Sequence, residues 1–104
     1  MKLEHYPLGK LKKEILEIVR KYLDTNSFKI FFFGSRVNDK ADQRSDIDVG
    51  IEGAEPVPFD VMLKIKNDVH NLHTLYHIDI VDFKSVDDDF YKVAKQKIEL
   101  ITLE

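Results

Sequence analysis

Asp46 and Asp48 are the residues whose types and spacing point most directly to chemistry. They alternate with Ile47, Val49 and Ile51, a period of two that is typical of a β-strand, so both carboxylates leave the same face. Adjacent carboxylates repel each other unless a cation lies between them, and magnesium prefers oxygen ligands that it shares with phosphates. Acids on an edge strand are commonly just a solvated face. Because this pair follows an aromatic-rich strand, we favour a site for two magnesium ions, suited to an in-line displacement at phosphorus.

A tight turn precedes the acid pair. The run 28–33 is apolar and aromatic and stops at Gly34, which lets the backbone leave a strand at an angle that a side chain would obstruct. Ser35 adds a hydroxyl, Arg36 adds a forked donor suited to phosphate, and backbone amides of such a turn can point at phosphate oxygens. A Gly-Ser dipeptide alone is usually no more than a turn, so this motif gains meaning only beside the acids.

A third acid can be chosen from the run 77–83, which we predict to be a strand. Ile78 and Ile80 should face the core, so Asp79 should share the polar face with the first pair of acids. Asp82 should fall on the core face unless the strand has already ended. We therefore prefer Asp79 as the third member.

The remaining pattern predicts the elements that hold these residues. Apolar stripes of helical spacing occupy 8–22 and 61–72, and a last helix should begin near Ser85 and carry apolar residues as far as Ile101. The order is helix, strand, strand, helix, strand, helix. We predict a single domain over 1–104 of the α/β (α+β) class, with a mixed sheet of three to four strands, helices on one face and the other face open to polar chemistry.

The composition narrows the class of protein. The 104 residues include 16 basic and 19 acidic side chains, a net charge of −3, which argues against direct binding to a nucleic-acid backbone. The absence of cysteine excludes disulfides and thiolate metal sites, and no apolar run is long enough to cross a bilayer. We expect a cytoplasmic protein without membrane contact.

These motifs together resemble the signature of the polymerase-beta-type nucleotidyltransferases. The resemblance rests on Gly34-Ser35-Arg36, a spacer of nine residues, and then Ser-Asp-Ile-Asp followed later by Ile-Asp-Ile-Val-Asp, and it covers about 28–83. The particular residues of these motifs are similar to those of the minimal nucleotidyltransferases (MNT), which are often the antitoxin half of paired HEPN–MNT systems. The resemblance implies the nucleotidyltransferase fold, two magnesium ions and site residues in two groups. The nucleotide-binding group is Gly34, Ser35, Arg36 and Ser45, and the catalytic and metal-binding group is Asp46, Asp48 and Asp79.

The resemblance also implies an activity and a partner. We expect transfer of a nucleoside monophosphate, AMP from ATP, to an acceptor hydroxyl on a HEPN-type helical protein, with Asp79 helping to deprotonate the acceptor. Homo- or hetero-oligomers are both compatible with this role. Relatives often have a second glycine after the arginine, where this chain has Asn38, Asp39 and Lys40. Asn and Asp tolerate left-handed backbone, so we expect the turn to persist.

Three alternatives compete with this function: a calcium loop, a zinc site and a docking protein. A calcium loop starting at Asp46 would need glycine at position six and glutamate at position twelve, where the chain has Ile51 and Val57. His70, His73 and His77 could hold zinc, but ordinary surface histidines are commoner. The strongest alternative is a catalytically silent protein that neutralises or scaffolds a partner by docking.

Overall fold

Three helices and four strands make up the described part of the chain, which comprises residues 1–38 and 45–102 of the computed structural model. In chain order they are α1 Leu8–Arg20, β1 Phe28–Phe33, β2 Ile47–Gly53, α2 Phe59–His70, β3 Ile78–Asp82, α3 Asp88–Ala94 and β4 Glu99–Leu100.

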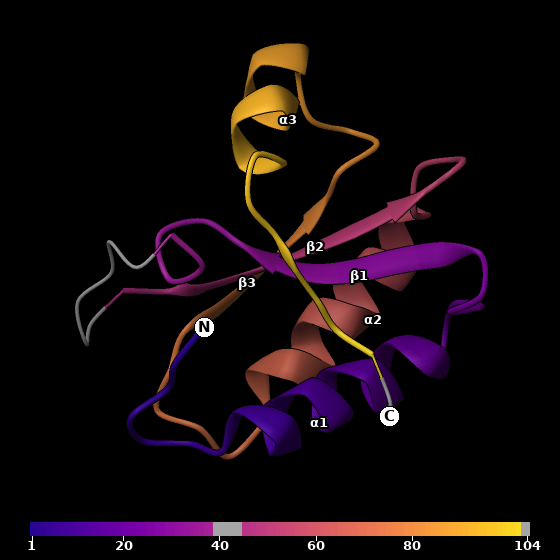
Figure 1. Ribbon diagram of the computed structural model, residues 1–104. Coiled ribbons are helices and arrows are strands. Elements are labelled where there is room, and N and C mark those ends of the chain that lie inside the picture. The colour runs from indigo at the N-terminus through magenta and orange to yellow at the C-terminus, as the bar shows by residue number, and fades with distance from the viewer. Residues whose placement is uncertain (39–44, 103–104) are drawn as a thin grey trace.

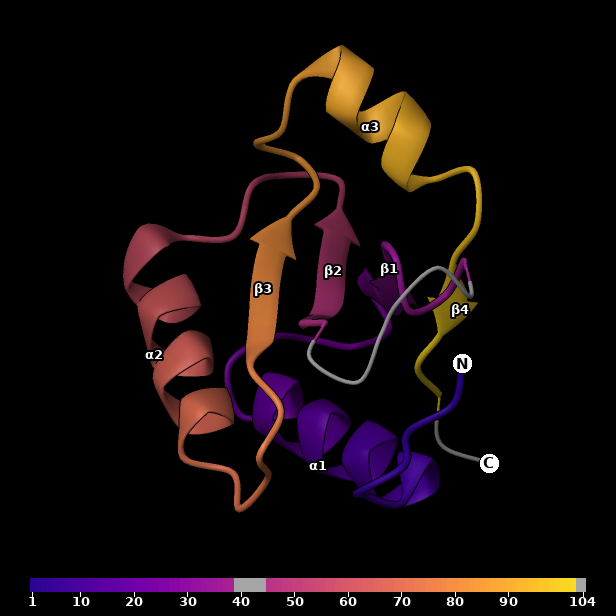
Figure 2. The same cartoon turned by 90° about the vertical axis from the view of Figure 1, so that its left-hand side faces the viewer.

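The strands form one mixed sheet in the order β3-β2-β1-β4. β1 runs antiparallel to both β2 and β4, whereas β2 and β3 are parallel and joined through α2. Figure 2 shows the four strands side by side, with β3 at one edge next to α2 and β4 at the other. The expected mixed sheet of three to four strands is confirmed.

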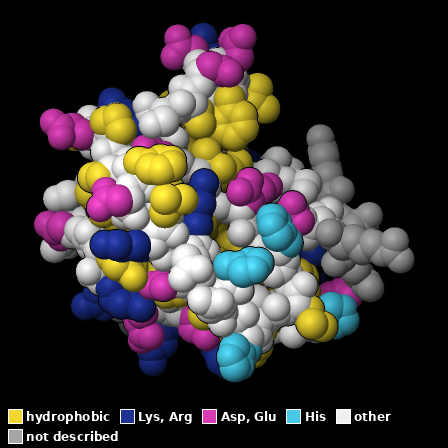
Figure 3. All heavy atoms as spheres, turned by 180° about the vertical axis from the view of Figure 1, so that it is seen from behind, with side chains coloured by type: hydrophobic (Ala, Val, Ile, Leu, Met, Phe, Trp, Pro, Cys, Tyr) yellow, Lys and Arg dark blue, Asp and Glu magenta, His cyan; other side chains and the backbone are white. Residues whose placement is uncertain are grey.

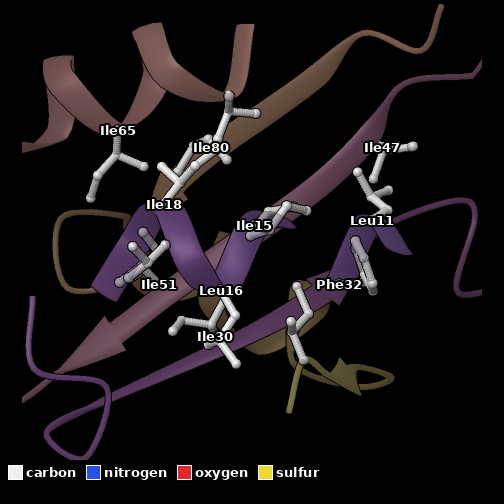
Figure 4. Packing of buried hydrophobic residues seen from close by; sticks show 14 of the residues in the cluster. Leu11, Ile15, Leu16, Ile18, Ile30, Phe32, Ile47, Ile51, Ile65 and Ile80 are labelled. Atoms are coloured by element: carbon white, nitrogen blue, oxygen red, sulfur yellow. The ribbon is translucent and has the colours of Figure 1, made fainter. Parts of the chain in front are cut away.

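The main core lies between the sheet and the first two helices. α1 and α2 cover the same face of the sheet (Figure 1), and the apolar stripe of α1 turns Leu11, Ile15 and Val19 into that layer. Side chains from helices and strands point toward one another in this layer (Figure 4), among them Ile47 and Ile51 of β2. Because side chains alternate along a strand, burying these isoleucines commits Asp48 to the opposite face.

The opposite face of the sheet is partly covered by α3. A second cluster of buried rings lies there, formed by Phe31, Phe33 and Phe83 in edge-to-face contacts. Lys95 donates a 2.6 Å hydrogen bond to Glu52 of β2, and this links the end of α3 to the sheet. The expected helices on one face are therefore α1 and α2. On the opposite face, only the part that α3 does not cover is left open for polar chemistry (Figure 1).

The predicted last helix is shorter than expected. α3 ends at Ala94, and the chain then extends into β4, which pairs with β1. The amide of Ile101 donates to the carbonyl of Ile30 at 2.9 Å. The spacing of apolar residues up to Ile101 was compatible with a helix, but pairing satisfies the outer backbone groups of β1, and this long-range contact outweighs the local period.

Asp87 caps α3, and its replacement tests how much the cap contributes. Its side chain accepts a 2.7 Å hydrogen bond from the amide of Phe90. We expect Asp87→Ala to lower the free energy of unfolding by about 1 kcal/mol, measured by urea denaturation. Asp89→Ala is the matched control, because it removes a first-turn charge without removing the cap and should cost only a few tenths of a kcal/mol. Equal losses would contradict the capping role.

Candidate active site

Asp48 and Asp79 lie side by side at the centre of the candidate site. The parallel register of β2 and β3 makes their Cα positions direct partners. Both side chains leave the face opposite the buried Ile47, Val49 and Ile80. The sequence predicted a shared face, and the structure adds that the two acids are immediate neighbours.

The electrostatics of this pair are unfavourable without a cation. Burial raises the pKa of the Asp48 carboxyl from its ordinary 3.8 to about 6, and the charges of Asp79 and Asp46 add to this rise. His77 acts in the opposite direction. Burial and neighbouring acids destabilise the ionised form of this half-buried carboxyl group. A bound cation would offset that cost, so the group is suited to binding one.

Asp46 and His77 form an exposed pair at the start of the two strands. Nδ1 of His77 lies 3.3 Å from Oδ2 of Asp46, and the backbone of His77 accepts a 2.9 Å hydrogen bond from the amide of Ile47. Figure 3 shows histidine side chains gathered beside acidic ones on this part of the surface. Sequence reasoning treated His77 as an ordinary histidine, because its distance in sequence from Asp46 hid the contact.

Gly34 packs directly against Asp48. Its φ is +83°, in the region that favours glycine, and a methyl group built on its Cα would overlap Oδ2 of Asp48. The amides of Val37 and Asn38 both donate to the Gly34 carbonyl at 3.2 Å, which closes the turn. Ser35 is exposed on this turn. The predicted turn is therefore in contact with Asp48, although Asp39 and Lys40 lie outside the described residues.

Arg36 faces the protein interior. Its side chain is only 8% exposed, and its Nε donates a 2.9 Å hydrogen bond to the carbonyl of Ser45. Its guanidinium also lies 4.7 Å from the centre of the Tyr76 ring. These contacts join the turn, the residue before Asp46 and the residue before His77. The phosphate contact expected for Arg36 and the nucleotide contact expected for Ser45 stay predictions.

Asp82 has a different task from Asp79. It accepts hydrogen bonds from the amides of Val57 and Lys84, at 2.9 and 3.0 Å, and from the hydroxyl of Ser85 at 3.1 Å. A side chain that closes turns in this way leaves a recognisable Asp-x-x-Ser pattern in the sequence. The alternation of β3 separates it from the face that carries Asp79.

The carboxylate oxygens of the site are ligands suited to a hard divalent cation, although the three acids are not gathered closely enough to bind one together. In the described ranges, 1–38 and 45–102, no group of three or more His, Cys, Asp and Glu side chains is gathered closely enough to hold a metal ion. Asp48 and Asp79 are adjacent, and the Asp46 side chain is 55% exposed and turned to His77. Rotation of this one exposed side chain would add its oxygens to the pair, so the residues fit magnesium.

Comparison with known proteins identifies the family. The family described as polymerase beta nucleotidyltransferase matches residues 13–103, which include the turn and all three acids. The chain belongs to this nucleotidyltransferase family. Members of the polymerase-beta nucleotidyltransferase family generally use divalent metal ions, in keeping with the oxygen donors of Asp46, Asp48 and Asp79.

Individual relatives of this nucleotidyltransferase have low sequence identity to it. It is 28% identical over 88 residues to the Haemophilus influenzae protein named probable protein adenylyltransferase MntA, covering 83% of this chain and 77% of that one. Among solved structures, it resembles a toxin–antitoxin complex with AMP-PNP (TM-score 0.69, 16% identity, 89% and 73% of the two chains covered). It also resembles the complex of a tri-AMPylated Shewanella oneidensis HEPN toxin with its MNT antitoxin (TM-score 0.67, 14% identity, 93% and 74% covered). The solved structures confirm the nucleotidyltransferase fold.

A helix that crosses a membrane needs about 20 mostly apolar residues. Across residues 1–38 and 45–102, no helix of this nucleotidyltransferase is both long enough and apolar enough to cross a bilayer.

Proposed function

We propose that this chain transfers AMP from ATP to a hydroxyl group on a partner protein. The observation that carries the proposal is the contact of Gly34 with Asp48, whose direct neighbour across the sheet is Asp79. A turn able to hold a triphosphate thus lies against carboxylates able to act on the reacting oxygen. The family of the chain and the name of its Haemophilus influenzae relative support the same reaction.

The residues divide the chemistry between them. Gly34 and Ser35 hold the triphosphate, while Asp79 accepts the proton of the acceptor hydroxyl. The acceptor oxygen then forms a bond to the α-phosphorus, the bond to the bridging oxygen breaks, and pyrophosphate leaves with the electron pair. The products are an AMP ester of the acceptor, pyrophosphate and one proton. Two magnesium ions held by Asp46, Asp48 and Asp79 would neutralise the charge of the triphosphate and of the leaving group.

The partner is inferred from the structural relatives. Two of them are complexes of a toxin with an antitoxin, one containing AMP-PNP and the other a tri-AMPylated HEPN toxin. We infer that the acceptor of this chain is a HEPN-type helical protein and that transfer neutralises it, which makes the chain an antitoxin.

The proposal is tested by label transfer. ATP radiolabelled at its α-phosphate is incubated with magnesium, this protein and the protein encoded beside it, and the double variant Asp46→Asn/Asp48→Asn serves as the control. We expect label on the neighbouring protein with the wild type and background label with the variant. A stable complex that accumulates no label with any of the four common NTPs would overturn transfer and favour neutralisation by docking.

A further inference from the structure

β3 is an edge strand that carries one of the site acids. In the described sheet it pairs only with β2, and its other side faces outward next to α2 (Figure 2). Asp79 is the second residue of this strand. Whatever reaches the outer side of β3 therefore comes close to the candidate site.

The hydrogen bonds at the two ends of β3 show which backbone groups face outward. The carbonyl of His77 accepts from Ile47 of β2, and the amide of Phe83 donates to Ile51 of β2, both at 2.9 Å. Alternate residues of a parallel strand bond to the same neighbour, so His77, Asp79, Val81 and Phe83 are directed to β2. The backbone groups of Ile78 and Ile80 are directed away from it, as a template for another strand.

A groove runs between this edge and α2. It consists of two adjoining hollows of about 320 and 520 Å³, which share Lys66, Asp79 and Ile80. We call this continuous feature the edge groove. Its larger hollow is lined by apolar side chains, including Met62 and the 79% exposed ring of Phe59. A row of outward backbone groups beside apolar pockets is the arrangement that binds extended peptides by strand addition.

We propose that the edge groove holds an extended segment of the acceptor protein, paired with β3 as an additional strand. This inference rests on the proposed function and names the substrate surface for it. In such a pairing, the residue opposite Asp79 projects from the same face of the sheet, with its Cβ about 5 Å from that of Asp79. Asp48 flanks Asp79 on one side, and the acceptor hydroxyl would approach on the other. Strand addition thus delivers a hydroxyl-bearing side chain to the proposed base.

Charge disfavours a second copy of this chain as the occupant. Antiparallel pairing of two β3 strands about Ile80 would place the two Asp79 side chains at diagonal positions, about 7–8 Å apart on one face. Each would bring a further carboxylate to a face of the sheet on which Asp48 and Asp79 are already direct neighbours. A segment that places an uncharged hydroxyl side chain opposite Asp79 brings no such repulsion.

Substitutions in the edge groove separate acceptor binding from nucleotide binding. We expect Phe59→Asp and Lys66→Glu to raise the KM for the partner protein at least tenfold in the label-transfer assay, while the KM for ATP changes less than twofold. Val93→Asp is the matched control, because it places the same charge on an exposed apolar position of α3 outside both hollows and should leave both constants unchanged. Wild-type transfer with an unchanged KM for the partner in both groove variants would overturn the groove inference.

Hydrogen exchange measured by NMR tests the strand pairing itself and does not require transfer. In the free protein, the amides of Ile78 and Ile80 should exchange faster than those of Asp79 and Val81. In the complex with the neighbouring protein, the first two should slow at least tenfold. A stable complex without that protection would overturn strand addition, and so would a dimer of this chain alone that Phe59→Asp dissociates. Absence of transfer with intact protection would overturn only the proposed function.

Discussion

Replacing Asp48 with asparagine should reduce label transfer by about 10²–10³-fold or more, because one substitution removes a metal ligand and the negative charge at the centre of the site. The same substitution should make the metal-free protein more stable. These opposite effects share a cause. The Asp48 carboxylate is suited to holding a cation, but burial and neighbouring acids make its ionised form unfavourable when no cation is bound. Transfer is measured with α-labelled ATP, and stability by urea denaturation in EDTA.

The sign of the stability effect follows from the raised pKa. Asp48 titrates near 6 in the folded protein and near 3.8 in the unfolded chain, so the folded state binds more protons between these values. Its contribution to stability is therefore present below pH 4 and is lost as the pH rises toward 6. Above that range, the ionised carboxylate costs about 1–2 kcal/mol after allowance for solvent screening. Asparagine should recover this amount at pH 7 and flatten the pH dependence.

Asp46→Asn is the matched control for this prediction. Asp46 belongs to the same proposed ligand set, but its side chain is exposed and paired with His77. It should reduce transfer with little gain in stability. A metal-free Asp48→Asn protein that is less stable than wild type at pH 7 would show that the carboxylate contributes net favourable interactions in the fold.

Gly34→Ala should have the second largest effect, on stability and on nucleotide binding together. A positive φ costs a non-glycine residue about 1–3 kcal/mol, and the new methyl group also meets the Asp48 carboxylate. We expect a loss of about 2–3 kcal/mol in urea denaturation and loss of detectable ATP binding in titration calorimetry with magnesium.

Gly9→Ala is the matched control for the glycine. Gly9 lies in α1, where a methyl group would meet nothing within 4 Å. It should stabilise the protein by up to about 1 kcal/mol, because alanine favours a helix. Wild-type ATP affinity in Gly34→Ala would remove the turn from the nucleotide site.

Local patterns in the sequence predicted much of this fold. The period of α1 and the alternation of β2 were readable because a side chain's direction follows from its position in a helix or strand. The choice of Asp79 over Asp82 for the polar face came from the same alternation. These predictions depend only on neighbours in the chain.

Contacts between distant segments could not be read in this way. The pairing of β4 with β1, the contact of His77 with Asp46 and the inward position of Arg36 each join segments that meet only after folding. Arginine is almost always exposed, so its type predicted a phosphate donor rather than a buried link. The exact register of Asp48 with Asp79 also depended on the parallel pairing, which alternation alone does not specify.

The two separate clusters of buried side chains imply that the fold has two levels of cooperativity. α3 contributes no buried residue of its own, so it depends on the rings of Phe31, Phe33 and Phe83 beneath it. Detaching α3 would expose those rings to water while the layer between α1, α2 and the sheet stayed intact. At about 2 kcal/mol for each Phe uncovered, such a sub-global opening is rare under native conditions, yet it costs less than complete unfolding. Mild denaturant should therefore populate a form in which the apolar rings on this face of the sheet are exposed. Self-association of the protein would begin at these rings.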